Sequence, residues 1–138
     1  MIMKTIYNSN RKFRIWAYTV SHSSLVLRSE MKYPDQDNYM ESLSYNIDLE
    51  FWEVNYINVP SDLLEINIRE ITVEILPEEI NRELLIHDMK IFELESCGFK
   101  YYVIAGGLLI GENKWENQDR VFNYNSNLEH EEIIFCSN

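Results

Sequence analysis

The chain has 138 residues, of which 46% are hydrophobic and 13% aromatic, a composition that fits one folded domain and excludes an intrinsically disordered protein. No stretch approaches the roughly 20 apolar residues of a membrane-spanning helix, and the first residues lack the apolar core of a secretory signal. Cys97 and Cys136 are the only cysteines, and in a chain without a leader we expect them to be reduced and buried, which favours the cytoplasm.

The net charge of −11 is distributed unevenly along the chain. Residues 1–33 hold six Lys or Arg and one acid, a net charge of +5, whereas residues 34–138 carry −16. An acidic surface of this kind repels nucleic acid phosphates and attracts cationic partners. We therefore expect no nucleic acid and no membrane as partner, and a basic protein is the partner that the charge favours.

The first predicted elements are two strands around a tight turn. Residues 13–20 are apolar or aromatic on both faces, which predicts a central strand. Residues 21–24 have the composition of a turn, and residues 25–27 form a second short apolar run. The polar segment 32–42 then predicts an exposed loop.

Residues 44–60, SYNIDLEFWEVNYINVP, alternate between polar and apolar side chains but change phase where Phe51 and Trp52 stand side by side. A slip of one residue predicts a β-bulge, with residues 45–51 and 52–57 both paired and the strand bent between them. Such a bend lets a strand pass from one sheet to another or turn the corner of a barrel.

A similar slip falls between Arg69 and Glu70, within residues 66–75. It predicts either a second bulge or a tight turn. The isoleucines at 68, 71 and 75 also match a helical spacing, but the β-branched residues that dominate this segment favour a strand.

The best helix candidate is residues 77–89, PEEINRELLIHDM. Pro77 suits the first position of a helix, and the two glutamates that follow it suit the positive end of the helix dipole. Ile80 and Leu84 begin an apolar stripe at helical spacing.

The rest of the chain predicts further strands. Cys97 and Gly98 lie between two alternating runs, which is the pattern of a hairpin, and Gly106-Gly107 ends the second run. The sequence then predicts a strand from residue 108, a polar loop at 111–120 and short strands at 121–124 and near 132–136.

These elements amount to about eight strands and one helix, with frequent turns. The pattern predicts a mainly β (α+β) fold, an antiparallel sandwich or partly open barrel with one helix against it. The chain has no internal repeat and no low-complexity tract, so we expect one domain that spans residues 1–138.

No catalytic constellation stands out in the sequence. Gly106 and Gly111 have the glycine spacing of a phosphate loop, but Glu112 occupies the position where such a loop needs Lys. The three histidines lie far apart and lack the local spacing of metal ligands. Ser21 and His22 are neighbours whose side chains would point apart on a strand. We expect a non-enzymatic protein without catalytic residues, metal ligands or a cofactor.

Trp115 stands in a polar loop among acidic residues, which is the pattern of an interaction hot spot. Alternatively, Trp115 folds back and plugs an end of the sheet, because large aromatic side chains are mostly buried. Residues 129–132, EHEE, would split between two faces of a strand, which favours a solvated acidic segment over a cation site. Trp16 and Trp52 lie in strand patterns and are expected in the core. The predicted partner-binding residues are Trp115, Glu112, Glu116, Asp119, Glu129, Glu131 and Glu132.

The stretch YTVSHSSLVLRS, followed later by NIDLEFWEVNYINVP, resembles small bacterial proteins of unknown activity. In that group a strand-turn-strand with Ser-His and Leu-x-Leu-Arg-Ser precedes an Ile-Asp-x-x-Phe strand that ends in Pro. The resemblance covers residues 18–60 at most and implies a bacterial source but no activity. The matching residues are Ser21, His22, Arg28 and Ser29. In this chain the pattern could fix a hairpin, with Arg28 meeting an acid such as Asp48 or Glu50.

Three functions follow from these observations. The first is a non-enzymatic acidic binding protein, such as a bacterial immunity-type protein whose carboxylates mask the Lys and Arg of a basic nuclease. The second is a β-barrel or sandwich that binds a small molecule. Its predicted lining is Trp16, Tyr18, Trp52 and Tyr101 or Tyr102. The third is a homo-oligomer that associates through an edge strand.

Overall fold

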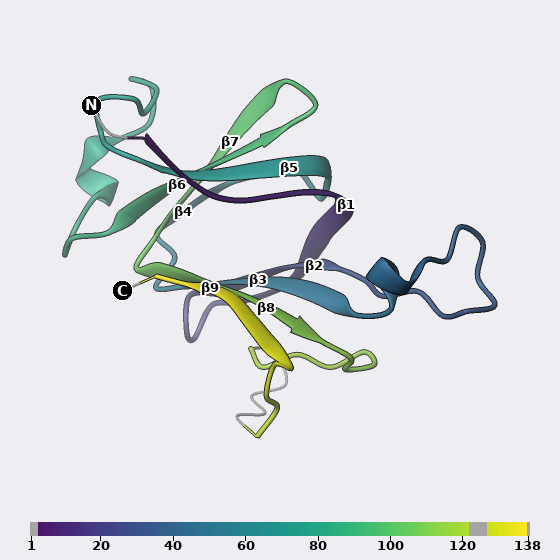
Figure 1. Ribbon diagram of the computed structural model, residues 1–138. Coiled ribbons are helices and arrows are strands. Elements are labelled where there is room, and N and C mark those ends of the chain that lie inside the picture. The colour runs from purple at the N-terminus through teal and green to yellow at the C-terminus, as the bar shows by residue number, and fades with distance from the viewer. Residues whose placement is uncertain (1–2, 122–126, 138) are drawn as a thin grey trace.

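A computed structural model describes residues 3–121 and 127–137 of the chain (Figure 1). The described residues form nine strands and two short 3-10 helices. The elements are β1 (Met3–Thr19), β2 (Ser24–Ser29), η1 (Glu41–Leu43), β3 (Asn46–Trp52), β4 (Tyr56–Asn58), β5 (Asp62–Ile71), η2 (Arg82–Leu84), β6 (Lys90–Ser96), β7 (Phe99–Ala105), β8 (Gly107–Asn113) and β9 (Glu132–Cys136).

All nine strands belong to one antiparallel sheet in the order β4-β7-β6-β5-β1-β2-β3-β8-β9. The long strand β1 joins the two halves, because its first part, as far as Arg14, pairs with β5 and its second part, from Arg14 on, pairs with β2. Figure 1 shows β1 bending so that the two halves lie face to face. The predicted mainly β antiparallel fold is confirmed, and the sheet stays open, with β4 and β9 as its edges.

The main hydrophobic core lies between the two halves of the folded sheet. Phe51 of β3 meets Phe92 of β6 edge to face, with 5.6 Å between the ring centroids. The half made by β1, β2, β3 and β8 contributes Phe13, Leu25, Leu27, Ile47, Leu49, Phe51, Leu108 and Ile110. The half made by β5, β6 and β7 contributes Leu63, Ile66, Ile68, Phe92, Leu94, Val103 and Ala105. Burial of this apolar surface is the main force that holds the sheet folded.

Residues 72–89 cover part of the β5–β7 half, but they do not form the helix that the sequence predicts for residues 77–89. Only the three residues of η2 are helical there, so this prediction is wrong. Ile80 packs into a second apolar cluster with Tyr102 and Ile104, and Arg82 donates hydrogen bonds to the carbonyls of Pro77 and Ile80. Since a side chain takes these carbonyls, the segment is stable without an i to i+4 ladder.

The phase change at Phe51 and Trp52 is not a bulge. Strand β3 keeps a regular register with β8 as far as Trp52, which lies opposite Gly107. The strand ends at Trp52, the next residue Glu53 has a φ of +50°, and β4 pairs with β7 at the other end of the sheet. The slip therefore marks where the chain leaves one half for the other. The predicted bulge at this position is wrong, and the chain passes between two halves of one open sheet, not between two sheets or around a barrel corner.

The second phase change lies inside a strand, as expected. Strand β5 runs through Arg69 and Glu70 in regular register with β6. The irregularity is on its other side, where the β1 register slips between Thr5 and Tyr7 opposite β5. The extra residue of this bulge thus comes from β1, and residues 72–75 form turns instead of strand.

Several local predictions hold in the last third of the chain. The hairpin turn falls at Cys97 and Gly98, both with positive φ, and β8 begins at Gly107. The predicted loop 111–120 begins later, because β8 continues to Asn113. Strand β9 confirms the strand predicted near 132–136, and most of the strand predicted at 121–124 lies outside the described residues.

Two predictions of burial are wrong. Cys97 and Cys136 form no disulfide, as expected, but both are exposed. Cys97 lies in the hairpin turn, and Cys136 lies in the edge strand β9. Trp16 and Trp52 are only half-buried. Trp16 lies beneath the Arg28 guanidinium at 4.5 Å, and Trp52 packs against Gly107 outside the core clusters. No helix in the described part of the chain is long and apolar enough to span a membrane.

Candidate functional site

The face of β3 that points away from the main core carries a buried ion pair. Asp48 is 0% exposed and Arg28, directly opposite on β2, is 1% exposed. Arg28 Nε donates to Asp48 Oδ1 at 2.6 Å, and Nη2 donates to Oδ2 at 2.8 Å. The expected pairing of Arg28 with an acid on the next strand is confirmed for Asp48.

Two asparagines extend this ion pair into a closed layer. Asn113 donates to Asp48 Oδ2 at 2.9 Å, and Asn46 donates to Asn113 Oδ1 at 2.8 Å. Asn46 also donates to the carbonyl of Trp115, and Arg28 donates to the carbonyl of Gln118. We call Arg28, Asn46, Asp48 and Asn113 the polar layer. Its bonds to Trp115 and Gln118 attach the segment after β8 to the sheet. The side chains of the layer also hydrogen-bond to one another.

Trp115 does not stand free in its loop. It is half-buried, and its ring lies 4.7 Å from that of His130, whose side chain is 0% exposed. His130 Nε2 lies 3.0 Å from Glu50 Oε2, and the His130 ring packs so closely on Gly111 that a Cβ there would sit 2.6 Å from it. This arrangement matches the alternative in which Trp115 folds back onto the sheet.

The seven predicted partner-binding residues fall into separate places. Asp119 is buried and accepts a hydrogen bond from the Val121 amide, and Glu116 bonds to Tyr33, which raises the pKa of that phenol. Glu129 is exposed. Trp115 itself contacts His130, the residue between Glu129 and Glu131 in the chain.

Three of the predicted acids do lie together, and we call Glu112, Glu131 and Glu132 the acidic edge. Glu112 is directly opposite Glu132 in the β8–β9 pair, and the Glu131 amide donates to the Glu112 carbonyl at 2.8 Å. The pKa of Glu112 is raised, first by burial and then by the negative charges of Glu132 and Glu131, and the positive charge of Arg11 partly opposes this rise. Residues opposite each other in an antiparallel pair share a face, so these charges repel one another.

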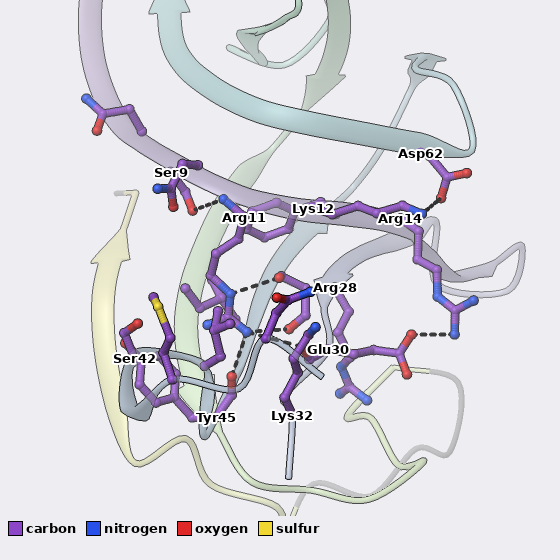
Figure 2. Close-up of a pocket in the computed structure, with 18 of the residues that line it drawn as sticks. Ser9, Arg11, Lys12, Arg14, Arg28, Glu30, Lys32, Ser42, Tyr45 and Asp62 are labelled. Carbon is purple, nitrogen blue, oxygen red and sulfur yellow. Dashed lines mark hydrogen bonds and ion pairs between the residues drawn. The ribbon is translucent and has the colours of Figure 1, made fainter. Parts of the chain in front are cut away.

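A surface of opposite charge lies at the bend of β1. It is a groove of about 1130 Å³ between β1, the end of β2 and the loop that leads to β3. Its charged lining residues are Arg11, Lys12, Arg14, Arg28, Lys32, Glu30 and Asp62. Figure 2 shows Arg11 and Arg14 pointing from β1 toward the segment after β2, with Lys32 on the opposite side. The sequence located these cations in residues 1–33 but gave no sign that they share a groove.

Arg11 occupies the inner end of the groove and is 9% exposed. Its Nε donates to Ser29 Oγ at 2.9 Å, and its Nη2 donates to the carbonyls of Ser29, Glu30 and Tyr45, the last at 2.7 Å. Its Nη1 is buried and has no hydrogen-bond partner among the described residues. No described carboxylate lies within 4.0 Å of this guanidinium. Burial lowers the pKa of Arg11, which reflects the cost of holding this charge away from water.

Apart from Arg28, the other cations of the groove are more exposed and loosely held. Arg14 forms an ion pair with Glu30. Lys12 lies 4.0 Å from Asp62, and Lys32 donates to the carbonyl of Asp37 at 2.9 Å. Exposed contacts of this kind contribute little to stability, so the side chains remain available to a ligand.

The aromatic lining predicted for a small-molecule pocket is not assembled. Tyr102 belongs to the second apolar cluster, Tyr101 packs against the main core, and Tyr18 is 43% exposed. Neither Trp16 nor Trp52 lines the groove. In the described structure the five aromatic residues of this predicted lining therefore lie in separate places.

The described residues include one close serine–histidine contact. Ser21 Oγ and His22 Nδ1 lie 3.0 Å apart in the exposed turn between β1 and β2. The expectation that these side chains point apart is wrong, because the residues lie in a turn and not on a strand. Exposure to water leaves such a pair without the desolvation that activates a nucleophile.

Metal binding and known relatives give no further assignment. Within residues 3–121 and 127–137, no group of three or more His, Cys, Asp or Glu side chains is placed to hold a metal ion. No family model, curated protein or solved structure matches the chain. The functional proposals therefore rest on the two charged surfaces, the acidic edge and the groove.

Proposed function

We propose that the protein is a non-enzymatic binding protein whose acidic edge docks a cationic protein partner. The observation that carries this proposal is the pairing of Glu112 with Glu132 across β8 and β9, with Glu131 next to them. Like charges directly opposite each other destabilise a sheet. Lys or Arg side chains of a partner would remove this repulsion and gain charge-assisted hydrogen bonds.

The neighbouring surface supports docking. Strand β9 is the last strand of the sheet, so no described strand covers its outer edge. Ile133 is 48% exposed and Ile134 is 37% exposed on the same strand. An open strand edge with apolar side chains and a rim of charge offers the three kinds of contact that protein interfaces use.

The partner chemistry that fits best is a basic protein, such as a nuclease with a Lys- and Arg-rich active site. In that role the chain would act as an immunity-type protein that masks those cations, and would do so in the cytoplasm. The net charge of −11 supports fast, salt-sensitive association with such a partner.

A cationic peptide tests this proposal without knowledge of the natural partner. Octalysine is titrated into the wild-type protein, into Glu131→Gln/Glu132→Gln, and into Glu78→Gln/Glu79→Gln. The last variant is the matched control, because it also removes two exposed acids but does so in the segment before η2. We expect affinity for octalysine to fall about tenfold in the first variant and less than about twofold in the control.

Ionic strength gives a second check on the same complex. Wild-type affinity should fall steeply between about 10 mM and about 150 mM salt, because the screening length shortens from about 30 Å to about 8 Å. Equal losses in both variants would show that only the total charge matters, and this result would remove the acidic edge as the docking site.

A further inference from the structure

The groove runs along an open edge of β1. On one side, Met3 to Arg14 pairs with β5, but on the other side pairing with β2 begins only at Arg14. Residues 3–13 therefore have no strand partner on that second side within the described parts of the chain. Eight consecutive residues of β1, 7–14, line the groove, so its wall includes the strand backbone as well as one side-chain face.

The charge of the groove is opposite to that of the chain. Five cations and two carboxylates line it, whereas the whole protein carries −11. The charge of Arg28 is neutralised by its ion pair with Asp48, which does not line the groove. The cations left for a ligand are Arg11, Lys12, Arg14 and Lys32.

Arg11 is the incompletely satisfied member of this set. Buried charges in proteins are normally paired with an opposite charge. Arg11 instead bonds to neutral oxygens, and its Nη1 has no partner in the described structure although the side chain is 91% buried. The charge of Glu112 acts on Arg11 without forming an ion pair, so an anion in the groove would supply a close opposite charge. The more exposed Lys12, Arg14 and Lys32 would make the first contacts with it.

We propose that the groove binds an acidic peptide segment in extended conformation. The segment lies extended beside residues 7–13 of β1, where the strand bulges between Ser9 and Lys12 and the Arg11 amide already bonds to Ser9 Oγ, so it pairs with the remaining groove-facing backbone groups. Its carboxylates lie against Lys12, Arg14 and Lys32, with one directed toward Arg11. An extended ligand fits this groove because the consecutive residues 7–14 of β1 form one of its walls. Strand addition explains why backbone lines the groove, and the cations select acidic side chains. No residue of the acidic edge lines the groove, although the charge of Glu112 acts on Arg11.

The test uses an eight-residue peptide of alternating Glu and Thr with blocked ends, and the same peptide with Gln in place of Glu. Both are titrated into the wild-type protein, into Lys12→Gln/Lys32→Gln and into Lys100→Gln/Lys114→Gln. The last variant is the matched control, since it removes two exposed lysines that do not line the groove. A protein of net charge −11 repels the acidic peptide elsewhere, so binding should report on the groove alone.

We expect the acidic peptide to bind the wild-type protein and to bind Lys12→Gln/Lys32→Gln about tenfold more weakly, with little change in the control. The Gln peptide should bind more weakly than the Glu peptide. Hydrogen exchange of the backbone amides of residues 7–13 should slow in the complex, which distinguishes strand addition from attraction between side chains alone.

Three results would overturn the proposal. The first is equal weakening in both lysine variants. The second is binding without protection of residues 7–13. The third is displacement of the peptide by inorganic phosphate at the peptide's own concentration, because that result would indicate a site for small anions. None of these results bears on octalysine binding at the acidic edge, so the two proposals fail separately.

Discussion

The polar layer and the groove each contain a buried arginine, and the two arginines are satisfied in different ways. Arg28 is 1% exposed and holds a carboxylate through two hydrogen bonds. Arg11 is 9% exposed and bonds to a hydroxyl and three carbonyls, with Nη1 unpartnered. The fold places a carboxylate in direct contact with Arg28, whereas Arg11 has the charge of Glu112 but no carboxylate within ion-pair distance. The difference separates a cation that holds the structure together from one that is available to a ligand.

The largest expected effect is on stability, in the polar layer. Asp48→Ala leaves Arg28 buried without an opposite charge, so we expect a loss of about 3–5 kcal/mol in the free energy of unfolding. Urea denaturation measures this loss, and Glu30→Gln serves as the control. Glu30 pairs with Arg14 on the surface, so its substitution should cost less than about 1 kcal/mol. Similar losses in both variants would contradict the structural role of the layer.

Arg11→Met should have a smaller effect. The substitution removes charge-assisted hydrogen bonds to Ser29, Glu30 and Tyr45, but it also removes a buried charge that has no carboxylate beside it. We expect a loss of about 1–2 kcal/mol in urea denaturation, together with weaker binding of the acidic peptide. A loss as large as that of Asp48→Ala would make Arg11 a structural residue like Arg28 and would weaken the contrast between them.

The smallest effect concerns the acidic edge and depends on pH. The raised pKa of Glu112 means that its protonated form stabilises the fold at low pH and that this contribution is lost as pH rises through the folded-state pKa. Glu112→Gln should therefore be more stable than wild type near neutral pH, by less than about 1 kcal/mol. The difference should disappear below the ordinary pKa of 4.5. Thermal unfolding across this range measures it, and a variant less stable at neutral pH would contradict the repulsion.

Local patterns in the sequence predicted most of the strands. Alternation located β3, and Cys97-Gly98 located the β6–β7 hairpin, because neighbouring residues determine pairing and turn geometry. The helix predicted for residues 77–89 was wrong because apolar residues there, such as Ile80, pack against β6 and β7. The local sequence pattern does not show this packing. Tertiary packing there overrides helix propensity.

The sequence predicted less of the sites. The meeting of Arg28 with Asp48 followed from two neighbouring strands, but the burial of that pair depends on a distant segment that begins at Trp115. The groove depends on where β2 ends and β1 bends, and no local pattern encodes that divergence. Glu112, Glu131 and Glu132 were brought together because β9 pairs beside β8, which local sequence does not show.

The central claim is that two surfaces of opposite charge bind opposite ligands independently, and a crossed titration tests it most directly. Octalysine and the Glu-Thr peptide are each titrated into the wild-type protein, Lys12→Gln/Lys32→Gln and Glu131→Gln/Glu132→Gln at one ionic strength. We predict that the lysine variant loses affinity for the acidic peptide alone and that the glutamate variant loses affinity for octalysine alone. If neither variant shows this selective loss of affinity, the result contradicts the account.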